Sequence, residues 1–582
     1  MVKDKKVKMN IIDKAINFVN PVKGAQRLYA RQMTKFLNSG YDSSGASLTK
    51  KSLREFNAES YSPQSDIDYN LKILRERSRV LEMSSPLASA AVNTTVTKTV
   101  GSGIFVKPSI DYEFLGLSKE EAEEWEHAAE REFLLWSESK HCDAACVHNF
   151  YEMQDLILRG MVSNGDGFAL IKYKKPTTFL PYELRLQIIE GDRVCTPYGG
   201  SEQCETYNFN FVEGKAKNGN RVISGIEIDD DGKKVAYYVC NRYPDEYIRL
   251  YNKMREWTRI EAYGKQTGNP NVLHLYNATR AGAYRGVPLL AVAIEPLKQL
   301  TRYSEAELMA SVVASMFTVF VTTNGSSANN PLSGMSNPFA GRYQTGVEEQ
   351  RRSNIDEITM GNGAITMLED GEKIEIANPS RPNSNYDAFV LSIYKQIGAA
   401  LEIPYEVLLK SYTSSYSASR AALLEAAEVF KKRRTFLQDD FCQPVYEMFL
   451  AEAISKGRLQ AKGFFTDPLR HKAWCSAKWN STATVPVLDP TKEVQAAKMR
   501  VEEGFSTREA ETVALNGSDY RTNVEQLVQE NTKLVEAKKI LVMAEEKVIQ
   551  AKLNSQNNDD NDESKTEELI DRVKSEIENN NK

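Results

Sequence analysis

The sequence predicts an α+β protein built from several domains. Three observations lead to this prediction: the chain is long, its strand-like segments gather in one stretch, and helical periodicity dominates on both sides of that stretch. At 582 residues the chain is too long for a single hydrophobic core. Its hydrophobic content of 41% and charged content of 26% are ordinary for folded proteins. We therefore expect an α+β lobe flanked by helical regions.

The N-terminal part is expected to be an arm followed by a helix. Residues 1–65 mix basic residues with Asn, Ser and Gly and show little periodicity, which is typical of a loosely attached segment. From residue 69 to about 98, apolar and small side chains recur every three or four positions, which predicts a helix. Its polar side carries Arg75, Arg77 and Arg79. We expect these arginines to lie on a solvated or inter-subunit face.

The stretch from residue 100 to 280 carries most of the strand signals. Helices are expected within it at 120–136 and 150–161, and the Asn-Gly-Asp-Gly of 164–167 is interpreted as a turn. The Asp-Asp-Gly at 230–232 predicts a hairpin between the two strands that flank it. The β-branched and aromatic runs predict strands at 100–108, 168–174, 184–190, 225–229, 234–240 and 272–276.

The next segment alternates between helix and strand. Residues 324–354 are rich in Gly, Asn, Ser and Pro, and we expect them to form a mobile insertion. Pro404 is expected to end the last helix of this segment. The predicted elements are a helix at 297–316, a strand at 317–322, a hairpin of strands at 364–368 and 373–376, and a helix from 383 to 403.

The C-terminal third is expected to be mainly helical. A helix from 419 to 454 should kink at Pro444, because proline lacks the backbone N–H that an unbroken helix needs. Apolar residues recur every seven positions from Leu527 to Val548, which predicts a coiled-coil-like seam. Residues 554–582 are rich in Asn, Asp, Glu and Lys and are expected to form a disordered acidic tail.

Composition limits the classes of function. The formal net charge is −5, so the chain lacks the basic excess with which proteins grip duplex DNA. A conduit through which DNA slides is still compatible with this charge, because tightly held phosphates would stall transport. The seven scattered cysteines predict reduced thiols. The most apolar run, 309–321, is shorter than the roughly 20 residues of a membrane span, so no membrane partner is expected.

The sequence gives no case for catalysis, and no enzyme activity, cofactor or metal is expected. It contains neither a GxxxxGK[ST] nucleotide loop nor a GxSxG nucleophile motif. His141, Cys142, Cys146 and His148 have the ligand types of a zinc site, but their spacing is poor. Ordinary buried thiols are the expected role of these cysteines. Paired carboxylates such as those at 439–440 are expected to be solvated.

The stretch from Ile397 to Glu425 carries the candidate functional residues. One helix ends at a proline there, a short Ser/Tyr-rich loop follows, and a longer helix begins at once. The loop holds a single lysine, Lys410. Loops of this composition are normally mobile connections, so a loop held between two helices is interpreted as a presented element. The basic residues 431–434 point around the next helix and are expected to be solvated or to form salt bridges between subunits.

Eight stretches, in this order along the chain, resemble portal proteins of the lambda-like tailed bacteriophages. The resemblance covers most of the chain from about residue 41 to 520, and it leaves out the arm before 41, the 324–354 insertion and the acidic tail. The matching stretches are Tyr41–Phe56, Leu74–Val92, Val100–Ile104, Gly165–Ile171, Gly225–Val239, Ala281–Leu290, Ile397–Glu425 and Asp489–Tyr520.

The resemblance implies a subunit of a ring, usually a dodecamer, at a unique vertex of the phage capsid. Carried over by motif, the side chains facing the DNA channel would be Lys410, Tyr412, Thr413, Ser414 and Tyr416. A symmetric ring would turn one lysine per subunit into a band of positive charge. The implied parts are an N-terminal arm at 1–65, a wing at 66–290 joined by a long kinked helix at 419–465, stem helices at 291–316 and 383–404, a β-rich clip at 317–382 that contains the 324–354 insertion, a channel loop at 405–418, a helical crown at 466–553 and a tail at 554–582.

The resemblance also implies partners and locations. The expected partners are the terminase large subunit, the major capsid and scaffolding proteins, a head–tail adaptor, and double-stranded DNA that passes through without sequence readout. The expected locations are the virion and, during assembly, the cytoplasm of the host bacterium. DNA would be packaged through the ring and later ejected through it.

Two other classes of function are open at this point. One is a scaffold or adaptor of virion assembly that forms no pore and uses the C-terminal coiled coil. It explains the seven-residue repeat but gives the channel loop no purpose. The other is a zinc-dependent or hydrolytic enzyme, for which the cluster at 141–148 would have to supply the chemistry. The sequence does not encode visibly the number of subunits, the host, the tail type or the processing of the termini.

Overall fold

The structure is a computed structural model that describes most of the chain. Its described residues are 59–198, 204–206, 212–244, 246, 255–316, 320–323, 372–375, 386–413, 415–483 and 489–556, with short stretches between 16 and 56. The chain divides into two units, Met1–Asp66 and Ile67–Lys582. In the first unit, Asn20 Oδ1 accepts a hydrogen bond of 3.2 Å from the backbone N–H of Lys23, which caps a helical stretch that begins at Pro21. The predicted insertion at 324–354 and most of the predicted tail lie outside the described residues.

The second unit begins with two helices where the sequence predicted one. A π-helical turn, η2 (Gln64–Asp68), leads into α3 (Tyr69–Ser84), and α4 (Pro86–Val100) follows. Ser85 between them is extended, with φ −107° and ψ 117°. The break has a local cause, because a residue before proline is pushed out of the helical region and proline itself is favoured at the first helical position.

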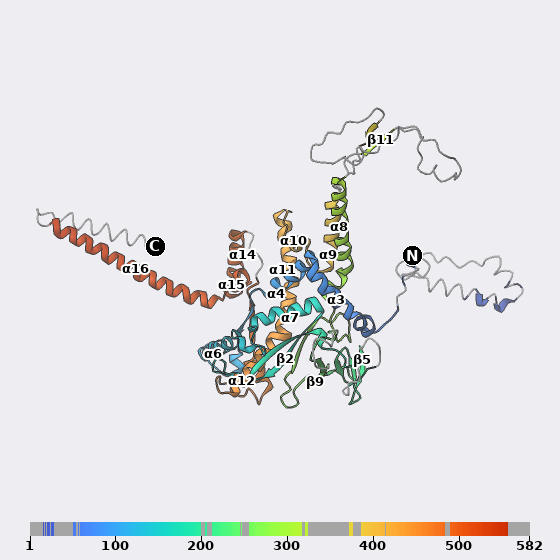
Figure 1. The fold of residues 1–582 in the computed structure, drawn as a ribbon. Helices are drawn as coiled ribbons and strands as arrows, with labels where there is room; N and C mark the ends of the chain where they lie inside the picture. The colour runs from blue at the N-terminus through green and yellow to red at the C-terminus, as the bar shows by residue number, and fades with distance from the viewer. Residues whose placement is uncertain are drawn as a thin grey trace, which may run out of the picture. The chain divides into compact units, whose positions relative to one another are not determined.

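Helices pack against a three-stranded antiparallel sheet in this lobe (Figure 1). The sheet has the order β10-β2-β3, and α7 packs against its central strand. Aromatic side chains from distant parts of the chain fill the core: Phe133, Trp136, Phe150, Phe441, Tyr446 and Phe449 are fully buried. The strands are β2 (Asp166–Tyr173), β3 (Leu184–Glu190) and β10 (Val272–Tyr276), and the helices are α5 (Tyr112–Leu115), α6 (Lys119–Ser137), η3 (Lys140–Cys142) and α7 (Phe150–Asn164).

The predicted helices and strands of this lobe are confirmed, and their ends have clear causes. Both α6 and α7 start with capping boxes, formed by Ser118 with Glu121 and by Asn149 with Glu152. The predicted strand at 100–108 is β1 (Ile104–Pro108). It pairs antiparallel with β13 (Ala477–Ser481), which the sequence pattern did not reveal.

A six-stranded antiparallel meander, β4 to β9, forms the second sheet of the lobe. The predicted hairpin is confirmed: β7 pairs with β8, and the backbone N–H of Gly232 donates to the carbonyl of Asp229 at 3.0 Å. The other strands of this sheet are short or lack clear alternation, and they were not predicted. The strands are β4 (Cys204–Thr206), β5 (Glu213–Ala216), β6 (Arg221–Ile223), β7 (Ile226–Ile228), β8 (Lys234–Cys240) and β9 (Trp257–Glu261), and η4 (Gly191–Arg193) precedes them.

Two helices leave the lobe side by side (Figure 1). After η6 (Leu289–Ala293), α8 (Ile294–Met316) packs against α9 (Tyr386–Ala400), and the rings of Tyr303 and Tyr386 stack with centroids 5.5 Å apart. In the segment that connects α8 to α9 along the chain, β11 (Phe320–Thr323) pairs antiparallel with β12 (Glu372–Glu375). The sequence predicted residues 364–368 as the partner of this second strand, and that segment lies outside the described residues.

The C-terminal third is helical, as predicted. The long helix is α11 (Tyr416–Leu437) followed by a π-helical turn, η8 (Gln438–Cys442), and α12 (Gln443–Ser455). The irregular turn stands immediately before Pro444, whose ring would clash with the carbonyl four residues earlier in a regular helix. The remaining elements are α10 (Tyr405–Leu409), α13 (Pro468–Trp474), α14 (Pro490–Glu502), α15 (Arg508–Asn516) and α16 (Tyr520–Gln556).

The seven-residue repeat lies on α16. Leu527 and Leu534 are exposed on this helix. The coiled-coil seam therefore stays a prediction, because no second helix covers these two side chains in the described part of the chain. Among the described helices, none combines the length and the hydropathy needed to cross a bilayer.

Candidate functional site

The candidate loop begins with a tight turn after α9. The helix ends at Ala400, and Glu402 takes a left-handed backbone conformation with φ +58°. The backbone N–H of Ile403 then donates to the carbonyl of Gly398 at 2.9 Å, which closes the helix end. The prediction that Pro404 ends the helix was therefore wrong. The helix ends about one turn earlier, at Ala400, and Pro404 instead precedes the next helix, α10.

A five-residue helix occupies what was expected to be loop. In α10, Val407 and Leu408 are buried, and the helix packs against α4, α9 and α11. Lys410 closes α10 in a left-handed conformation with φ +54°, and its backbone N–H donates to the carbonyl of Glu406. The predicted loop at 405–418 is thus shorter than expected, because residues 405–409 and 416–418 are helical. We call residues 410–415 the channel loop from here on, after the role that the resemblance implies for them.

The predicted site residues fall into two groups. Lys410, Tyr412 and Thr413 are all exposed on the channel loop, and Ser414 lies outside the described residues. Tyr416 is the first residue of α11, after Ser415, whose Oγ accepts a hydrogen bond of 3.4 Å from the backbone N–H of Ala418. The structure therefore brings three of the predicted residues onto one exposed stretch and places Tyr416 on a helix beside it.

Arg433 and Arg434 were expected on a solvated face or in salt bridges between subunits, but both are partly buried and contact other segments of the same chain. The guanidinium of Arg434 donates to the backbone carbonyls of Thr99 at 2.8 Å and Ala483 at 2.9 Å. Arg433 contacts the turn between α9 and α10, with a guanidinium nitrogen 3.5 Å from the carbonyl of Leu401. Burial lowers the pKa of both arginines. They join α11 to its neighbours, whereas Lys431 and Lys432 are exposed.

Gly398 permits the close approach that shapes the turn. A Cβ at this position would lie 2.6 Å from the carbonyl oxygen of Ile403, which is closer than real Cβ contacts come. Gly398→Ala should therefore displace α10, even though alanine favours helix by about 1 kcal/mol over glycine. We expect a net destabilisation of roughly 1–3 kcal/mol, measured as a fall in the unfolding midpoint. Ala399→Ser, at an exposed neighbouring position, should change the midpoint little.

A second cluster is built around Asp166, which begins β2 and is completely buried. Its Oδ2 accepts hydrogen bonds from the guanidinium of Arg75 and from Nε of Arg285, the latter at 2.8 Å. Its Oδ1 accepts from the backbone N–H of Gly286 at 2.8 Å and from Nε2 of His274 at 3.0 Å. Burial alone would raise the pKa of Asp166, but Arg285 and Arg75 outweigh it and hold the pKa well below its usual range.

This cluster corrects two predictions. Arg75 was expected on a solvated or inter-subunit face, yet it is buried and also donates from Nε to the carbonyl of Asn164 at 2.7 Å. The Asn-Gly-Asp-Gly sequence was interpreted only as a turn, yet its aspartate carries the buried charge. Arg285 extends the cluster by donating to the carbonyls of Val194 and Gly191, each at 2.8 Å. The signal that could have revealed the cluster is that Arg75, Asp166 and Arg285 each lie in a different one of the eight stretches that carry the resemblance.

The cluster of His and Cys residues at 141–148 has the geometry of a local turn. Cys142 is buried, and burial raises the pKa of its thiol. Cys146 is exposed, with its Sγ 3.6 Å from Nδ1 of His141. Over the described ranges there is no group of three or more His, Cys, Asp or Glu side chains that could hold a metal ion.

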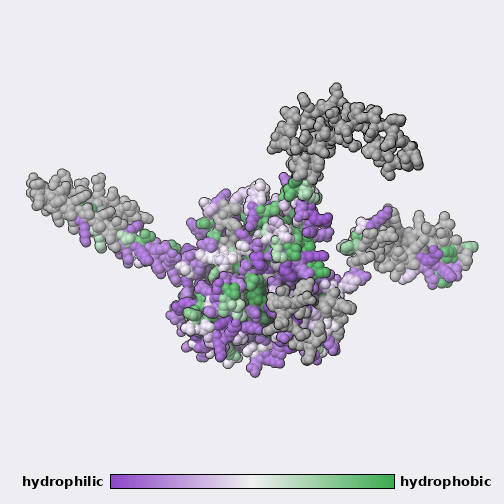
Figure 2. All heavy atoms as spheres, viewed as in Figure 1, coloured by the Kyte–Doolittle hydropathy of each residue, from purple (hydrophilic) through white to green (hydrophobic). Residues whose placement is uncertain are grey.

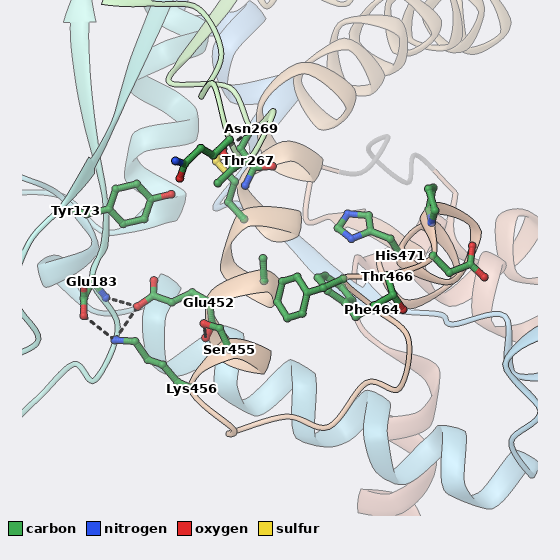
Figure 3. Close-up of a pocket in the computed structure, with 16 residues that line it drawn as sticks. Tyr173, Glu183, Thr267, Asn269, Glu452, Ser455, Lys456, Phe464, Thr466 and His471 are labelled. Atoms are coloured by element: carbon green, nitrogen blue, oxygen red, sulfur yellow. Dashed lines mark hydrogen bonds and ion pairs between the residues drawn. The ribbon is translucent and has the colours of Figure 1, made fainter.

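A cavity of about 810 Å³ lies between α12, Glu183, residues 266–269 and residues 464–468. Figure 3 shows side chains that line it. Glu452 accepts a hydrogen bond of 2.9 Å from the backbone N–H of Leu184, and Lys456 Nζ lies 3.0 Å from Glu452 and 3.3 Å from Glu183. These charges are paired with one another. They attach α12 to the edge of the sheet.

Comparison with known proteins covers most of the chain. Portal protein B of Escherichia phage lambda is 23% identical over 516 residues, which cover 84% of this chain and 89% of that protein. The portal protein of Escherichia phage N15 is 24% identical over 507 residues, covering 85% and 90%. A solved chain from the virion of a native gene transfer agent particle matches with a TM-score of 0.37 and 11% identity, over 77% of this chain and 94% of that chain. The family model described as phage portal protein, lambda family, matches residues 49–434. The chain belongs to this family of phage portal proteins.

Proposed function

We propose that copies of this chain close side by side into a ring, through which double-stranded DNA is packaged and later ejected. Family membership is the observation that carries this proposal. Members of the family are structural components of the virion, not enzymes. The ring would sit at a unique capsid vertex, in contact with the capsid and scaffolding proteins, receive the terminase large subunit during packaging, and afterwards hold a head–tail adaptor.

The stem helices offer the apolar surface that ring closure requires. Leu308 and Met309 on α8 and Phe389 and Leu391 on α9 are exposed in the single chain, and Figure 2 shows hydrophobic surface on this helix pair. Exposed apolar stripes on adjacent helices support side-by-side packing of identical subunits, which is the arrangement that closes into rings. In this proposal, α8 and α9 form the stem, β11 and β12 belong to the clip, and α14 to α16 belong to the crown.

The channel loop would face the bore of this ring. Lys410 is exposed and lies at the end of α10, whose other side is buried in the core. The packing of α10 therefore fixes the position of the Lys410 backbone. One lysine per subunit, on a chain with net charge −5, suits weak contacts with the DNA backbone and no sequence readout.

Lys410→Ala is expected to leave ring assembly intact and to alter DNA packaging or DNA retention. Loss of the phosphate contacts should make DNA retention less sensitive to salt, measured on filled particles at several salt concentrations. Lys410→Arg keeps the charge and should behave like the unmodified protein. Lys410→Gly removes the charge and suits the left-handed backbone, so it should reproduce the alanine phenotype. Failure of the alanine variant to assemble would instead assign Lys410 a structural role.

A scaffold or adaptor that forms no pore is the second candidate, favoured by the exposed Leu527 and Leu534 on α16. Negative-stain class averages of the purified protein separate the two functions. A uniform ring with a central hole supports the portal proposal, and rods or compact particles support the scaffold.

A further inference from the structure

Polar side chains join the first turn of α11 to the first turn of α14. Arg420 on α11 forms an ion pair with Glu493 on α14, and its Nη1 also lies 3.3 Å from the hydroxyl of Tyr416. The ammonium of Lys492 lies over the ring of Tyr416, 5.5 Å from the ring centroid. Two neighbouring side chains of α14 therefore hold the residues that immediately follow the channel loop. We call these four residues, Tyr416, Arg420, Lys492 and Glu493, the clamp.

The start of α14 fixes the α14 side of the clamp. Asp489 caps this helix by accepting a hydrogen bond of 3.3 Å from the backbone N–H of Lys492. The carboxylate of Asp489 also lies 3.0 Å from Nζ of Lys492. The ammonium that covers Tyr416 is thus oriented by its own helix cap.

The two ends of the channel loop are held by different kinds of interaction. On the α10 side, Val407 and Leu408 are buried in the core. On the α11 side, residues 416–418 are exposed and the clamp contacts Tyr416, and the next residue, Ser419, is buried. Arg420 and Glu493 retain 36% and 18% of their side-chain exposure, so water and salt weaken their attraction. The α10 side is fixed by packing, whereas the exposed first turn of α11 is held by polar contacts that water and salt weaken.

We propose that Glu493 and Lys492 are positioning residues of the channel loop, through which the C-terminal helices set where its α11 end lies. The clamp would restrain the loop at rest and release it when the loop is displaced or when α14 moves. Any effect of the clamp on DNA rests on the proposed function. The restraint of the loop does not, because all four clamp residues lie in one chain.

Hydrogen exchange of the amides of residues 410–420 in the purified full-length protein tests the proposal. Glu493→Gln keeps the shape of the side chain and removes the charge, so exchange at these amides should become about two- to fivefold faster, as expected for an exposed ion pair. Glu502→Gln is the matched control, because Glu502 lies at the other end of α14 and pairs only locally, 3.6 Å from Lys498. The exchanged pair, Arg420→Glu with Glu493→Arg, should restore the slow rate.

Equal exchange rates in Glu493→Gln and Glu502→Gln would overturn the proposal, as would failure of the exchanged pair to restore the rate. DNA retention, measured separately on filled particles, addresses the proposed function. Faster exchange with unchanged DNA retention would support the clamp and contradict the role of the loop in holding DNA.

Discussion

Asp166→Asn is expected to destabilise the α+β lobe by about 3–5 kcal/mol, the largest effect of any single substitution considered for this chain. The substitution keeps the shape of the side chain but removes the negative charge that Arg75 and Arg285 share. Both arginines are buried, so their charges would be left without a counter-ion in a medium that solvates them poorly. Breaking one partner of a buried ion pair therefore costs much more than losing a surface contact.

Thermal unfolding of the purified protein measures this effect. A loss of this size should lower the unfolding midpoint of the lobe by on the order of 10 °C. Asp230→Asn, in the exposed turn between β7 and β8, is the matched control and should change stability by less than about 0.5 kcal/mol. Midpoints that agree for the two variants would show that the Asp166 cluster contributes no more than a surface charge.

The sequence predicted the elements whose signals are local. Helical patterns at 120–136 and 150–161 located α6 and α7, and the Asp-Asp-Gly turn located the β7–β8 hairpin. Pairing between distant segments carries no such local signal. The partner of Ile104 in β1 is Ser481 in β13, and Asp166 meets Arg285, which lies 119 residues further along the chain. The resemblance places Asp166 and Arg285 in two of its stretches, whereas β13 lies outside all eight, so no feature of the sequence pointed to its pairing with β1.

Contacts between distant segments also explain why the sequence did not predict α10, the short helix before the channel loop. The lysine and the tyrosine of this loop stood out by composition, but the five residues of α10 are too few to show helical periodicity. Burial of Val407 and Leu408 against α4 stabilises this short helix, and that contact joins segments more than 300 residues apart. The clamp was missed for the same reason, because Arg420 and Glu493 are 73 residues apart.

Mild acid is expected to weaken the lobe through His274. The ring of His274 is buried between Phe168 and Tyr276, and burial, opposed in part by its hydrogen bond to Asp166, lowers its pKa to about 3. The ammonium of Lys234, 3.2 Å from Nδ1, lowers the pKa further and supports the neutral ring that donates from Nε2 to Asp166.

The sign of the pH dependence follows from these positions. Below the unfolded pKa of about 6.5, the unfolded chain takes up a proton at His274 that the folded lobe refuses until about pH 3. The free energy of unfolding should therefore fall with decreasing pH by about 1.4 kcal/mol per unit between these values, or about 2 kcal/mol by pH 5. The lowered pKa values of Asp166 and Glu227 add losses only below about pH 4, because those carboxylates are ionised in both states above it.

Urea unfolding at pH 7, 6 and 5 measures this slope directly. His274→Asn should be less stable at pH 7, since it loses the stacked ring, but its stability should change little between pH 6.5 and 5. His471→Asn is the control, because His471 lies outside the Asp166 cluster, and it should retain the full slope. A variant without His274 that keeps the slope would show that another group takes up the proton. The buried imidazole would then be a packing residue whose charge state does not limit the stability of the lobe.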